Sequence, residues 1–404
     1  MRNPVKVAFL FTTFPKLTET FLQREIRAMR RLPVDLELFS LWGGEAQFEG
    51  MTVRRFSKAK LVALLWWLPY WAARKPAAFS GMFKSLAEQP MPSWKNLGET
   101  LIGIFFAITH AALLSKQGHR PDFVHGVWAT MPATAAQLMA KLTGIPFTMG
   151  AHAYDIYQNG GDWLLPGKLA DAALVVTSTE MVREELLRRG ADPAKVVVVR
   201  RGLYTFPSLG VLRSTRSPLR ILSVARLVEK KGILAQLEIF AEMKRRNIPF
   251  EARIVGDGPL AKRARARAKK LGLADDVSFL GSLLFAGVLA QYAWADAFVF
   301  TGAVAEDGDR DGLPNVIVEA LATGTPVVAS KSAAISELVE DGRNGILLSG
   351  TNPEIWIRAL VRLRDDDVHY GRIRREGRTT VEEHGDARCN ATALLEHFGA
   401  VSGK

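Results

Sequence analysis

Short, nearly continuous apolar runs recur along the chain and alternate with longer stretches in which apolar residues return at a helical period. Apolar runs of this kind are typical of parallel strands whose two faces are both covered by helices. The pattern therefore predicts repeated strand–helix–strand units and the α/β fold class. The predicted strands cover residues 5–12, 34–42, 123–125, 147–149, 174–176, 196–199, 219–224, 253–255, 277–280, 297–300 and 327–329.

The alternation is interrupted once, between two regions that each contain enough strands for a doubly wound sheet. Residues 206–218 contain two prolines, a glycine and several Ser and Thr residues without periodicity, which is typical of a linker. We therefore expect an N-terminal Rossmann-like domain over residues 1–205 and a C-terminal one over residues 219–383. A terminal amphipathic helix is expected within residues 384–404.

Composition limits the class of protein. A chain of 404 residues with 48% hydrophobic residues can bury large cores. The single cysteine, Cys389, excludes an internal disulfide framework and any multi-cysteine metal site, and it is typical of a reducing compartment. The apolar run near the N-terminus ends in Pro and Lys without a small-residue cleavage site, so we interpret it as a first strand rather than a signal peptide.

The formal net charge of +12 is spread unevenly. Residues 51–120 contain ten Lys or Arg residues against two acids, Glu88 and Glu99. A local excess of this size indicates an anionic partner near residues 51–118, which we call the basic helical segment. Nucleic acid is the less favoured partner, because the basic residues flank large apolar runs and no nucleic-acid-binding fold is recognised.

Two apolar runs lie inside the basic helical segment. The first, residues 61–73, is too short to cross a bilayer, which takes about twenty apolar residues, and we expect Pro69 to break it. The second, residues 97–114, is longer, but Glu99 and His110 within it argue against a membrane-spanning helix.

Tryptophan and tyrosine beside Lys and Arg are typical of a helix that lies in a membrane interface. The candidates for the acceptor or membrane side of the protein are Trp66, Trp67 and Trp71. The alternative is a pair of helices that packs on the N-terminal sheet with its aromatic residues in the core. Both descriptions can hold at once.

A polar loop and a helix between residues 307 and 326 carry the clearest candidate chemistry. Asp311 precedes the helix, expected over residues 314–322, and Glu319 lies about a turn and a half inside it. The backbone N–H groups of residues 312–315 lack helical acceptors and carry the positive end of the helix dipole. Such a helix start suits a ligand with anionic and hydroxylated parts, for example a sugar nucleotide. The alternative is that both acids only cap and solvate the helix.

Two basic residues follow the first strand of the second sheet, in the stretch SVARLVEKKG. The guanidinium of Arg226 and the ammonium of Lys231 together match the charge of a diphosphate, and Gly232 allows a close approach. Gly256, after the next strand, would let the backbone approach a nucleotide. The alternative is that Arg226 and Lys231 merely face solvent after the strand.

These motifs resemble the retaining nucleotide-sugar glycosyltransferases of family 4. Their signature is an acid, seven residues and Glu, with an upstream Arg-Leu and Lys-Gly pair. The stretch FPKLTETF at residues 14–21 resembles the subset that builds bacterial exopolysaccharides such as colanic acid. The chain departs from the family in having Asp311 where Glu is usual, and in lacking a glycine-rich turn after the first strand.

The resemblance implies the GT-B architecture, in which two Rossmann-like domains face a central cleft and the terminal helix packs back on the first domain. It implies that His152, at a strand end in AHAYDIY, contacts the donor sugar or the acceptor hydroxyl as a catalytic residue. Asp155 is a second candidate there, and His125 is structural or on the acceptor side. Glu319 would hold the ribose hydroxyls, and Asp311 the transferred sugar. The implied donor-binding residues are Arg226, Lys231, Gly232, Gly256, Gly312, Leu313, Pro314, Asn315 and Glu319.

We therefore expect an enzyme that transfers a sugar from a nucleoside diphosphate to a hydroxyl of a lipid-linked glycan in bacterial exopolysaccharide or lipopolysaccharide synthesis. It would be cytoplasmic, with peripheral contact to the inner membrane, and would need no cofactor. Asp307-Gly308-Asp309 resembles the metal-binding motif of another glycosyltransferase class, but Arg226 and Lys231 can neutralise the leaving diphosphate, so no metal is expected. The alternatives are an epimerase or phosphorylase of the same fold, or an inactive membrane-docked scaffold.

Overall fold

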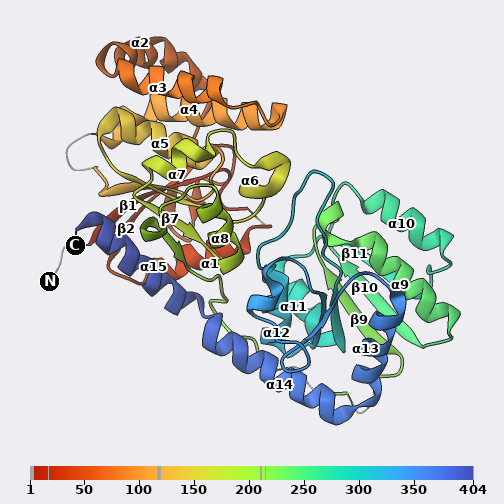
Figure 1. Cartoon of the computed structure of the whole chain (residues 1–404). Helices are drawn as coiled ribbons and strands as arrows, with labels where there is room; N and C mark the ends of the chain where they lie inside the picture. Colours follow the sequence, from red (N-terminus) through yellow and green to blue (C-terminus); the bar gives the residue numbers. More distant parts are fainter. Residues whose placement is uncertain (1–3, 17, 116–119, 210–211, 214, 404) are drawn as a thin grey trace. The chain divides into compact units, whose positions relative to one another are not determined.

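The computed structural model describes residues 4–16, 18–115, 120–209, 212–213 and 215–403 (Figure 1). Leu17, Lys116 and residues 210, 211 and 214 of the expected linker lie outside this set. The chain divides into two compact units. The first comprises residues 1–200 and 387–404, and the second comprises residues 201–386.

The first unit is built on an eight-stranded sheet with the order β3-β4-β2-β1-β5-β6-β7-β8. All of its strand pairs are parallel except the short β3–β4 hairpin. The strand order reverses between β1 and β5, which makes this a doubly wound sheet. The strands are β1 (Val5–Phe11), β2 (Val34–Ser40), β3 (Gln47–Phe48), β4 (Met51–Arg55), β5 (Phe123–Gly126), β6 (Phe147–Gly150), β7 (Leu174–Thr177) and β8 (Val196–Val198).

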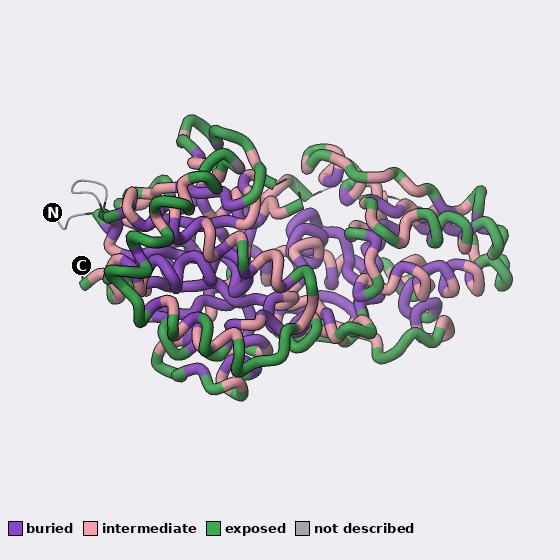
Figure 2. The backbone as a smooth tube through the Cα atoms, turned by 90° about the horizontal axis from the view of Figure 1, so that it is seen from above, coloured by how far each residue is buried: buried purple, intermediate pink, exposed green. Residues whose placement is uncertain are grey.

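The helices of this unit cover both faces of the sheet, as the continuous burial of β1, β5, β6 and β7 requires (Figure 2). The sequence pattern did not predict β3 and β4, because two to five residues with exposed charges give little apolar signal. The helices are α1 (Thr20–Met29), α2 (Leu64–Arg74), α3 (Pro76–Glu88), α4 (Trp94–Leu114), α5 (Met131–Thr143), α6 (Tyr154–Tyr157), α7 (Leu165–Asp171), α8 (Glu180–Arg188) and α15 (Ala387–Ser402).

The later part of the basic helical segment forms α2, α3 and α4, which lie on the outer side of α5 (Figure 1), whereas its first five residues form the strand β4 and not a helix. Gly103 permits the contact of α4 with α5, because a Cβ there would lie 2.7 Å from the carbonyl oxygen of Met131. The expectation that Pro69 breaks the first helix is wrong, since α2 continues to Arg74. The carbonyl that loses its helical donor belongs to Leu65, which is exposed and can be hydrated.

In the part of the chain that the structure describes, α4 is the one helix long and apolar enough to cross a membrane. Its inward face is buried with Phe106, Ala107, Ala111 and Leu114 in the core of the first unit. The helix packs on α5, and 44% of its most apolar stretch is buried.

The second unit is built on a six-stranded, all-parallel sheet with the order β11-β10-β9-β12-β13-β14. Numbered from the first strand of this unit, the order is that of the Rossmann fold, and it reverses between β9 and β12. The strands are β9 (Leu219–Val224), β10 (Phe250–Val255), β11 (Val277–Gly281), β12 (Ala297–Phe300), β13 (Val327–Ser330) and β14 (Ile346–Leu348). The helices are α9 (Ile233–Arg245), α10 (Ala261–Lys270), α11 (Phe285–Trp294), α12 (Asn315–Thr323), α13 (Pro353–Asp365) and α14 (Asp367–His384). The expectation of two doubly wound Rossmann-like sheets is confirmed.

The last helix, α15, belongs to the first unit, although the chain reaches it from the second. It packs against α1 and β1. Phe398 is fully buried, and its ring centre lies 6.1 Å from that of Phe9 and 4.8 Å from that of Phe123. The apolar face of α15 therefore completes the core beneath the sheet, and Cys389 lies on its exposed side.

Candidate active site

The candidate site in the second unit lies at the carboxyl ends of the adjacent strands β10, β9 and β12. Backbone hydrogen bonds join the loops that follow these strands: the N–H of Leu227 donates to Asp257, and that of Ala303 donates to Lys230, each at 2.9 Å. The loops after β9 and β12 flank the point at which the strand order reverses. Ligands bind at this point in open α/β sheets, because the loops there diverge.

Two lysines after β9 pair with two aspartates after β12. The Nζ of Lys231 lies 2.7 Å from Oδ2 of Asp311, and the Nζ of Lys230 lies 2.8 Å from Oδ1 of Asp309 and 3.5 Å from Oδ1 of Asp311. All four side chains are mostly buried. The structure thus brings Lys231 and Asp311 together, which the sequence analysis assigned to one site on separate grounds.

These ion pairs affect the protonation of Asp311. Burial raises the pKa of the Asp311 carboxylate. The ammonium groups of Lys231 and Lys230 lower this pKa by more than burial raises it, so the pKa lies below its ordinary value. A carboxylate whose pKa is lower in the folded chain than in the unfolded chain stabilises the fold above the unfolded value. This contribution is lost as the pH falls through the folded pKa, so acid should weaken the connection between the two loops.

Lys230 is a site residue that the sequence analysis missed. It follows an exposed Glu229 and looks like one member of a surface lysine pair, yet its side chain is only 9% exposed. Its Nζ also lies 3.4 Å from the carbonyl oxygen of Arg310. Lys230 therefore fixes the path of the loop that carries Asp311. The signal in the sequence that could have indicated Lys230 was the high content of acids in that loop. Acids that become buried need a nearby cation, so a buried lysine could be expected beside them.

Two glycines of the site are required by close backbone contacts. Gly232 has φ 65°, and a Cβ there would lie 1.9 Å from the carbonyl oxygen of Thr301. Gly256 has φ 127°, and a Cβ there would lie 1.9 Å from the carbonyl oxygen of Ala225. Neither position can accept a side chain without moving the loops apart. Because Gly232 and Gly256 have no side chain, the backbones of the loops after β9, β10 and β12 can lie in contact.

The helix α12 begins directly after the acidic loop, with Pro314 as its N-cap residue, and ends at Gly324 with φ 73°. The expectation that each of residues 312–315 offers an N–H group is wrong for Pro314, because proline has none. The N–H of Ile317 donates to the carbonyl oxygen of Pro314, so the N–H groups at the start of α12 without a helical acceptor are those of Asn315 and Val316. Gly312 and Leu313 lie just before this helix start, and both are half-buried.

Glu319 lies inside α12 and is only 6% exposed. The hydroxyl of Tyr292 in α11 lies 3.4 Å from Glu319 Oε2 and donates to the carbonyl oxygen of Val316 at 3.1 Å. A carboxylate buried on the second turn of a helix is not a solvated surface acid, so the structure opposes that alternative. Arg226, by contrast, is exposed at the start of the β9 loop.

In the first unit, His152 lies in the loop after β6 and is 9% exposed. The carboxylate of Asp155 accepts hydrogen bonds from the backbone N–H groups of His152, Ala153 and Ala129 at 2.8–3.1 Å. Burial raises the pKa of Asp155, and these three donors lower it in part. The structure therefore gives Asp155 a positioning role: it holds the loop that carries His152. The indole of Trp128 meets the His152 ring edge to face at 5.2 Å.

His125 is a core residue. It is 3% exposed, its Nδ1 lies 2.8 Å from the hydroxyl of Thr148, and its ring contacts Phe9 and Phe398. Burial lowers its pKa to about 3, so the ring is neutral at physiological pH. Of the two roles considered for His125, the structural one matches these contacts.

The three tryptophans proposed for the acceptor or membrane side have different environments. Trp66 is 77% exposed and Trp67 is half-buried. Trp71 is 6% exposed, and its indole N–H donates to the carbonyl oxygen of Ile108 at 3.2 Å. Trp71 therefore matches the alternative in which an aromatic residue of this segment packs in the core, because α2 turns this side of its helix toward α4.

Comparison with known proteins shows which family the chain belongs to. Residues 218–366 match the family model described as glycosyl transferases group 1, and residues 18–202 match the glycosyl transferase 4-like domain. The chain is 28% identical over 374 residues to a Salmonella typhimurium protein named as a colanic acid biosynthesis glycosyltransferase, covering 85% of this chain and 87% of the relative. It is 25% identical to the amylovoran biosynthesis glycosyltransferase of Erwinia amylovora, covering 94% and 95%.

Solved structures show the same fold. An Anabaena protein crystallised with UDP and glucose superposes with a TM-score of 0.70 at 17% identity, over 98% of this chain and 100% of that one. Sucrose-phosphate synthase from Thermosynechococcus elongatus superposes with a TM-score of 0.74 at 14% identity, over 99% of each chain. Fold and family together define a glycosyltransferase of the GT-B type. The chain belongs to the group 1 glycosyltransferases with a glycosyl transferase 4-like first domain, and the resemblance seen in its sequence is confirmed.

Proposed function

We propose that this glycosyltransferase moves a hexose from a nucleoside diphosphate to a hydroxyl of a lipid-linked glycan, with retention at the anomeric carbon, during bacterial surface polysaccharide synthesis. The relatives named for colanic acid and amylovoran synthesis, each aligned over most of both chains, support the pathway. The observation that carries the donor assignment is the contact of Lys231 with Asp311 at the reversal of strand order, beside Gly232 and the start of α12.

The proposed roles follow from charge and reach. Arg226 and Lys231 hold the diphosphate and stabilise the charge that develops on it as the glycosidic bond breaks. An ammonium has three N–H donors, so Lys231 can contact a phosphate and keep its pairing with Asp311. Glu319 accepts hydrogen bonds from the ribose hydroxyls, and Asp311 accepts one from the transferred sugar.

The remaining groups complete the reaction. The first amides of α12, at Asn315 and beyond, face a region of negative ligand charge with the positive end of the helix dipole. His152 contacts the donor sugar or the acceptor hydroxyl. In this proposal the two cationic side chains, Arg226 and Lys231, neutralise the diphosphate. The reaction then uses only groups of the chain itself and needs no cofactor or metal.

Replacing Glu319 with glutamine tests the ribose contact. The amide keeps the size of the side chain but loses an anionic acceptor of two hydrogen bonds, which contributes about 1.5–3 kcal/mol. We therefore expect the donor Kd to rise about 10- to 100-fold. Thermal shift with UDP, GDP and ADP sugars identifies the donor in the wild type, because a ligand at a hundred times its Kd stabilises the fold by about 2.7 kcal/mol.

Glu238→Gln is the matched control, since Glu238 pairs with Arg267 on the surface of the second unit. It should leave the donor Kd unchanged. An unaltered Kd in Glu319→Gln would remove Glu319 from the donor site. Binding of a donor without sugar transfer to membrane-extracted glycan would instead favour the inactive scaffold, and interconversion of the sugar without transfer would favour an epimerase.

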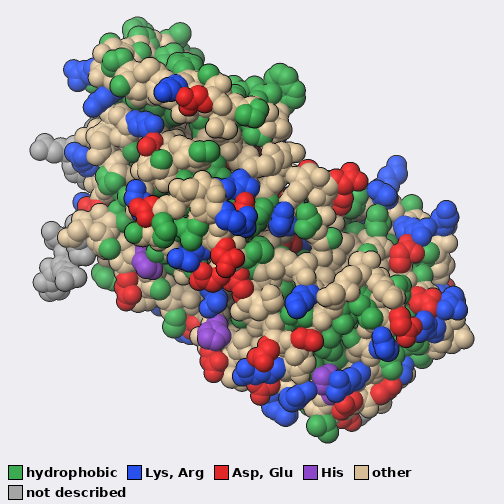
Figure 3. All heavy atoms as spheres, viewed as in Figure 1, with side chains coloured by type: hydrophobic (Ala, Val, Ile, Leu, Met, Phe, Trp, Pro, Cys, Tyr) green, Lys and Arg blue, Asp and Glu red, His purple; other side chains and the backbone are tan. Residues whose placement is uncertain are grey.

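The membrane part of the proposal rests on α2 and α3. Large apolar side chains are exposed there with Arg74, Lys75 and Lys84 beside them, and Figure 3 shows hydrophobic and basic side chains together over these helices. Exposed Trp and Leu next to cations suit the interface of an anionic membrane. The exposed apolar residues of η1 (Lys58–Ala63), α2 and α3 are Leu61, Val62, Leu65, Trp66, Leu68, Tyr70 and Phe83.

A variant with Leu65→Ser and Trp66→Ser tests this surface. Each side chain contributes at least about 1.5 kcal/mol when it is buried in an apolar phase, so we expect about 100-fold weaker partition. The measurement is co-sedimentation with vesicles of phosphatidylglycerol and phosphatidylethanolamine. The control carries Leu284→Ser and Val368→Ser, which remove exposed apolar residues from the second unit and should bind like wild type. Equal sedimentation of both variants would end the membrane proposal.

A further inference from the structure

The helix α10 has an unusually basic sequence, AKRARARAKK, in which six of ten residues are Lys or Arg and none is an acid. Ala264 and Ala268 are its buried residues and lie in the core of the second unit. An α-helix turns once in about 3.6 residues, so the side opposite these alanines points into solvent, and Figure 3 shows Lys and Arg side chains over this helix. Four exposed cations form this side, which we call the basic face: Lys262, Arg263, Lys269 and Lys270.

The cations of the basic face are unpaired: among the described residues, none of the four forms an ion pair or a side-chain hydrogen bond. The arginines on either side of the face do have partners. Arg267 Nε lies 2.7 Å from Glu238 Oε1, and the guanidinium of Arg265 lies 4.9 Å from the ring centre of Phe279. These contacts fix the borders of the face and leave four positive charges directed at solvent.

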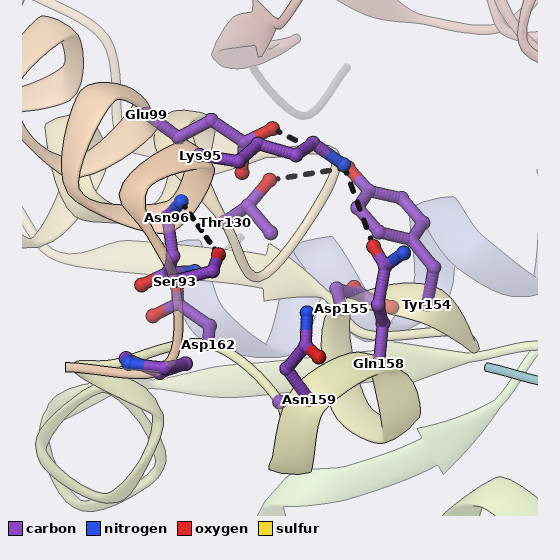
Figure 4. A pocket seen from close by; sticks show the side chains of 12 residues that line it. Ser93, Lys95, Asn96, Glu99, Thr130, Tyr154, Asp155, Gln158, Asn159 and Asp162 are labelled. Carbon is purple, nitrogen blue, oxygen red and sulfur yellow. Dashed lines mark hydrogen bonds and ion pairs between the residues drawn. The ribbon is translucent and has the colours of Figure 1, made fainter. Parts of the chain in front are cut away.

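Basic residues on other helices of this chain are matched by an acid about one turn away on the same helix. Figure 4 shows such a pair at the start of α4, where Lys95 Nζ lies 3.9 Å from Glu99 Oε1. Pairs of the same kind occur on α3, α8, α9, α13 and α14. A solvated helix surface in this protein therefore mixes the two signs of charge, and α10 departs from that pattern.

The charge of α10 opposes the stability of its own helix. Lys262 and Arg263 lie in the first turn, where the positive end of the helix dipole disfavours cations, and no acid lies in that turn. Arg263 and Arg267 are like charges four residues apart, an arrangement that destabilises a helix, and Arg265 and Lys269 repeat it. Sequences that conflict with local stability are expected where a surface has a function. The basic face is therefore better explained by an anionic partner than by solubility alone.

We propose that the basic face of α10 binds the anionic surface of a lipid membrane. Its four cations extend over about 12 Å of helix, which matches a surface of separate negative head groups rather than one phosphate. The other residues of the helix are alanines and the two bordering arginines, so it offers neither aromatic rings for stacking on bases nor amide side chains for reading them, which disfavours nucleic acid. This inference rests on the membrane part of the proposed function and adds the second unit to it: the surface of α2 and α3 would bind by apolar burial, and α10 by charge.

A full-length variant that combines Lys262→Gln, Arg263→Gln, Lys269→Gln and Lys270→Gln tests this inference by co-sedimentation with vesicles. Each Lys or Arg beside an anionic membrane strengthens binding roughly fivefold, so we expect partition into vesicles of phosphatidylglycerol and phosphatidylethanolamine to weaken at least about 10-fold. The difference from wild type should disappear when phosphatidylcholine replaces phosphatidylglycerol, and when NaCl is raised from about 0.05 M to about 0.5 M. Glutamine is a good helix former and removes like-charge repulsion, so the variant should fold with an unchanged or higher Tm.

The control variant loses the same net charge from the same unit, through glutamine at four exposed arginines that are paired with acids: Arg245, Arg343, Arg358 and Arg362. It should bind vesicles like wild type. Equal losses in the two variants, or no loss in either, overturn the inference, as does a loss of binding to duplex DNA without a loss of binding to vesicles. The variant with Leu65→Ser and Trp66→Ser and the thermal shift with the nucleotide sugar are measured in parallel. If both behave as expected, a failure at α10 leaves the proposed function intact.

Discussion

Replacing Lys231 with methionine is expected to lower the kcat of sugar transfer about 10²- to 10³-fold, the effect of removing one preorganised group that stabilises developing charge. Methionine keeps the apolar stem, whose end lies beside the ring of Phe300, but removes the ammonium. The loops should remain joined, because Lys230 stays 2.8 Å from Asp309 and 3.5 Å from Asp311. The measurement is release of the nucleoside diphosphate from the donor found by thermal shift.

Lys244→Met is the control for this prediction. Lys244 pairs with Asp276 on the surface of the same unit and should be replaceable with less than a twofold change in kcat. A loss in kcat that exceeds the change in donor KM would place the ammonium on the leaving diphosphate. If Lys231→Met retained a third or more of the wild-type kcat, the diphosphate would have to be held elsewhere.

Replacing Lys168 with methionine is expected to destabilise the first unit by about 3–5 kcal/mol, the cost of removing one partner of a buried ion pair. Lys168 is fully buried in α7, 2.5 Å from Asp162 Oδ1 and 2.6 Å from the carbonyl oxygen of Ala129. Burial lowers its pKa, and the field of Asp162 raises it in part. Without the ammonium, Asp162 remains buried and loses its cation, although the N–H of Leu164 and the amide of Asn96 still donate to it.

The change can be followed as a urea unfolding transition, with the midpoint moving to lower concentration at an unchanged slope. Lys141→Met provides the comparison, because Lys141 forms a 2.9 Å pair with Asp171 at the surface, where such pairs contribute about 0–1 kcal/mol. Similar midpoints for the two variants would show that the Lys168 pair adds no more than a surface pair. Since Lys168 also holds Ala129, next to Trp128, its loss should disturb the loop of His152 as well.

Much of the fold could be predicted from the sequence. The apolar runs predicted the strands of both sheets, except β3, β4 and β14, to within a few residues, and the helix expected over residues 314–322 corresponds to α12. The candidates Lys231, Gly232 and Asp311 were found by residue type and spacing, and the structure brings them together. Such features depend on local periodicity and on backbone conformations that few residues can adopt.

Other parts of the site could not be predicted. The sequence does not show that Lys230 is buried as well as Lys231, because their burial depends on where the loop after β12 passes over them. Trp66 and Trp71 have the same residue type five positions apart, and only the packing of α2 against α4 decides that one is exposed and the other buried. Asp155 was a candidate for catalysis. In the structure its carboxylate accepts hydrogen bonds from three backbone N–H groups in two different loops, and the local sequence does not predict that these loops meet.

The sequence by itself determined the alternation of strands and helices, the two sheets, and the residue types at the carboxyl ends of the strands. Only the tertiary structure decided which of those ends are neighbours and which side chains become buried between them. The physical reason is that period and propensity act over a few residues, whereas strand order and helix packing are fixed by contacts between residues far apart in the chain. The ion pairs of Lys230 and Lys231 after β9 with Asp309 and Asp311 after β12, about eighty residues later, are a product of the second kind of contact.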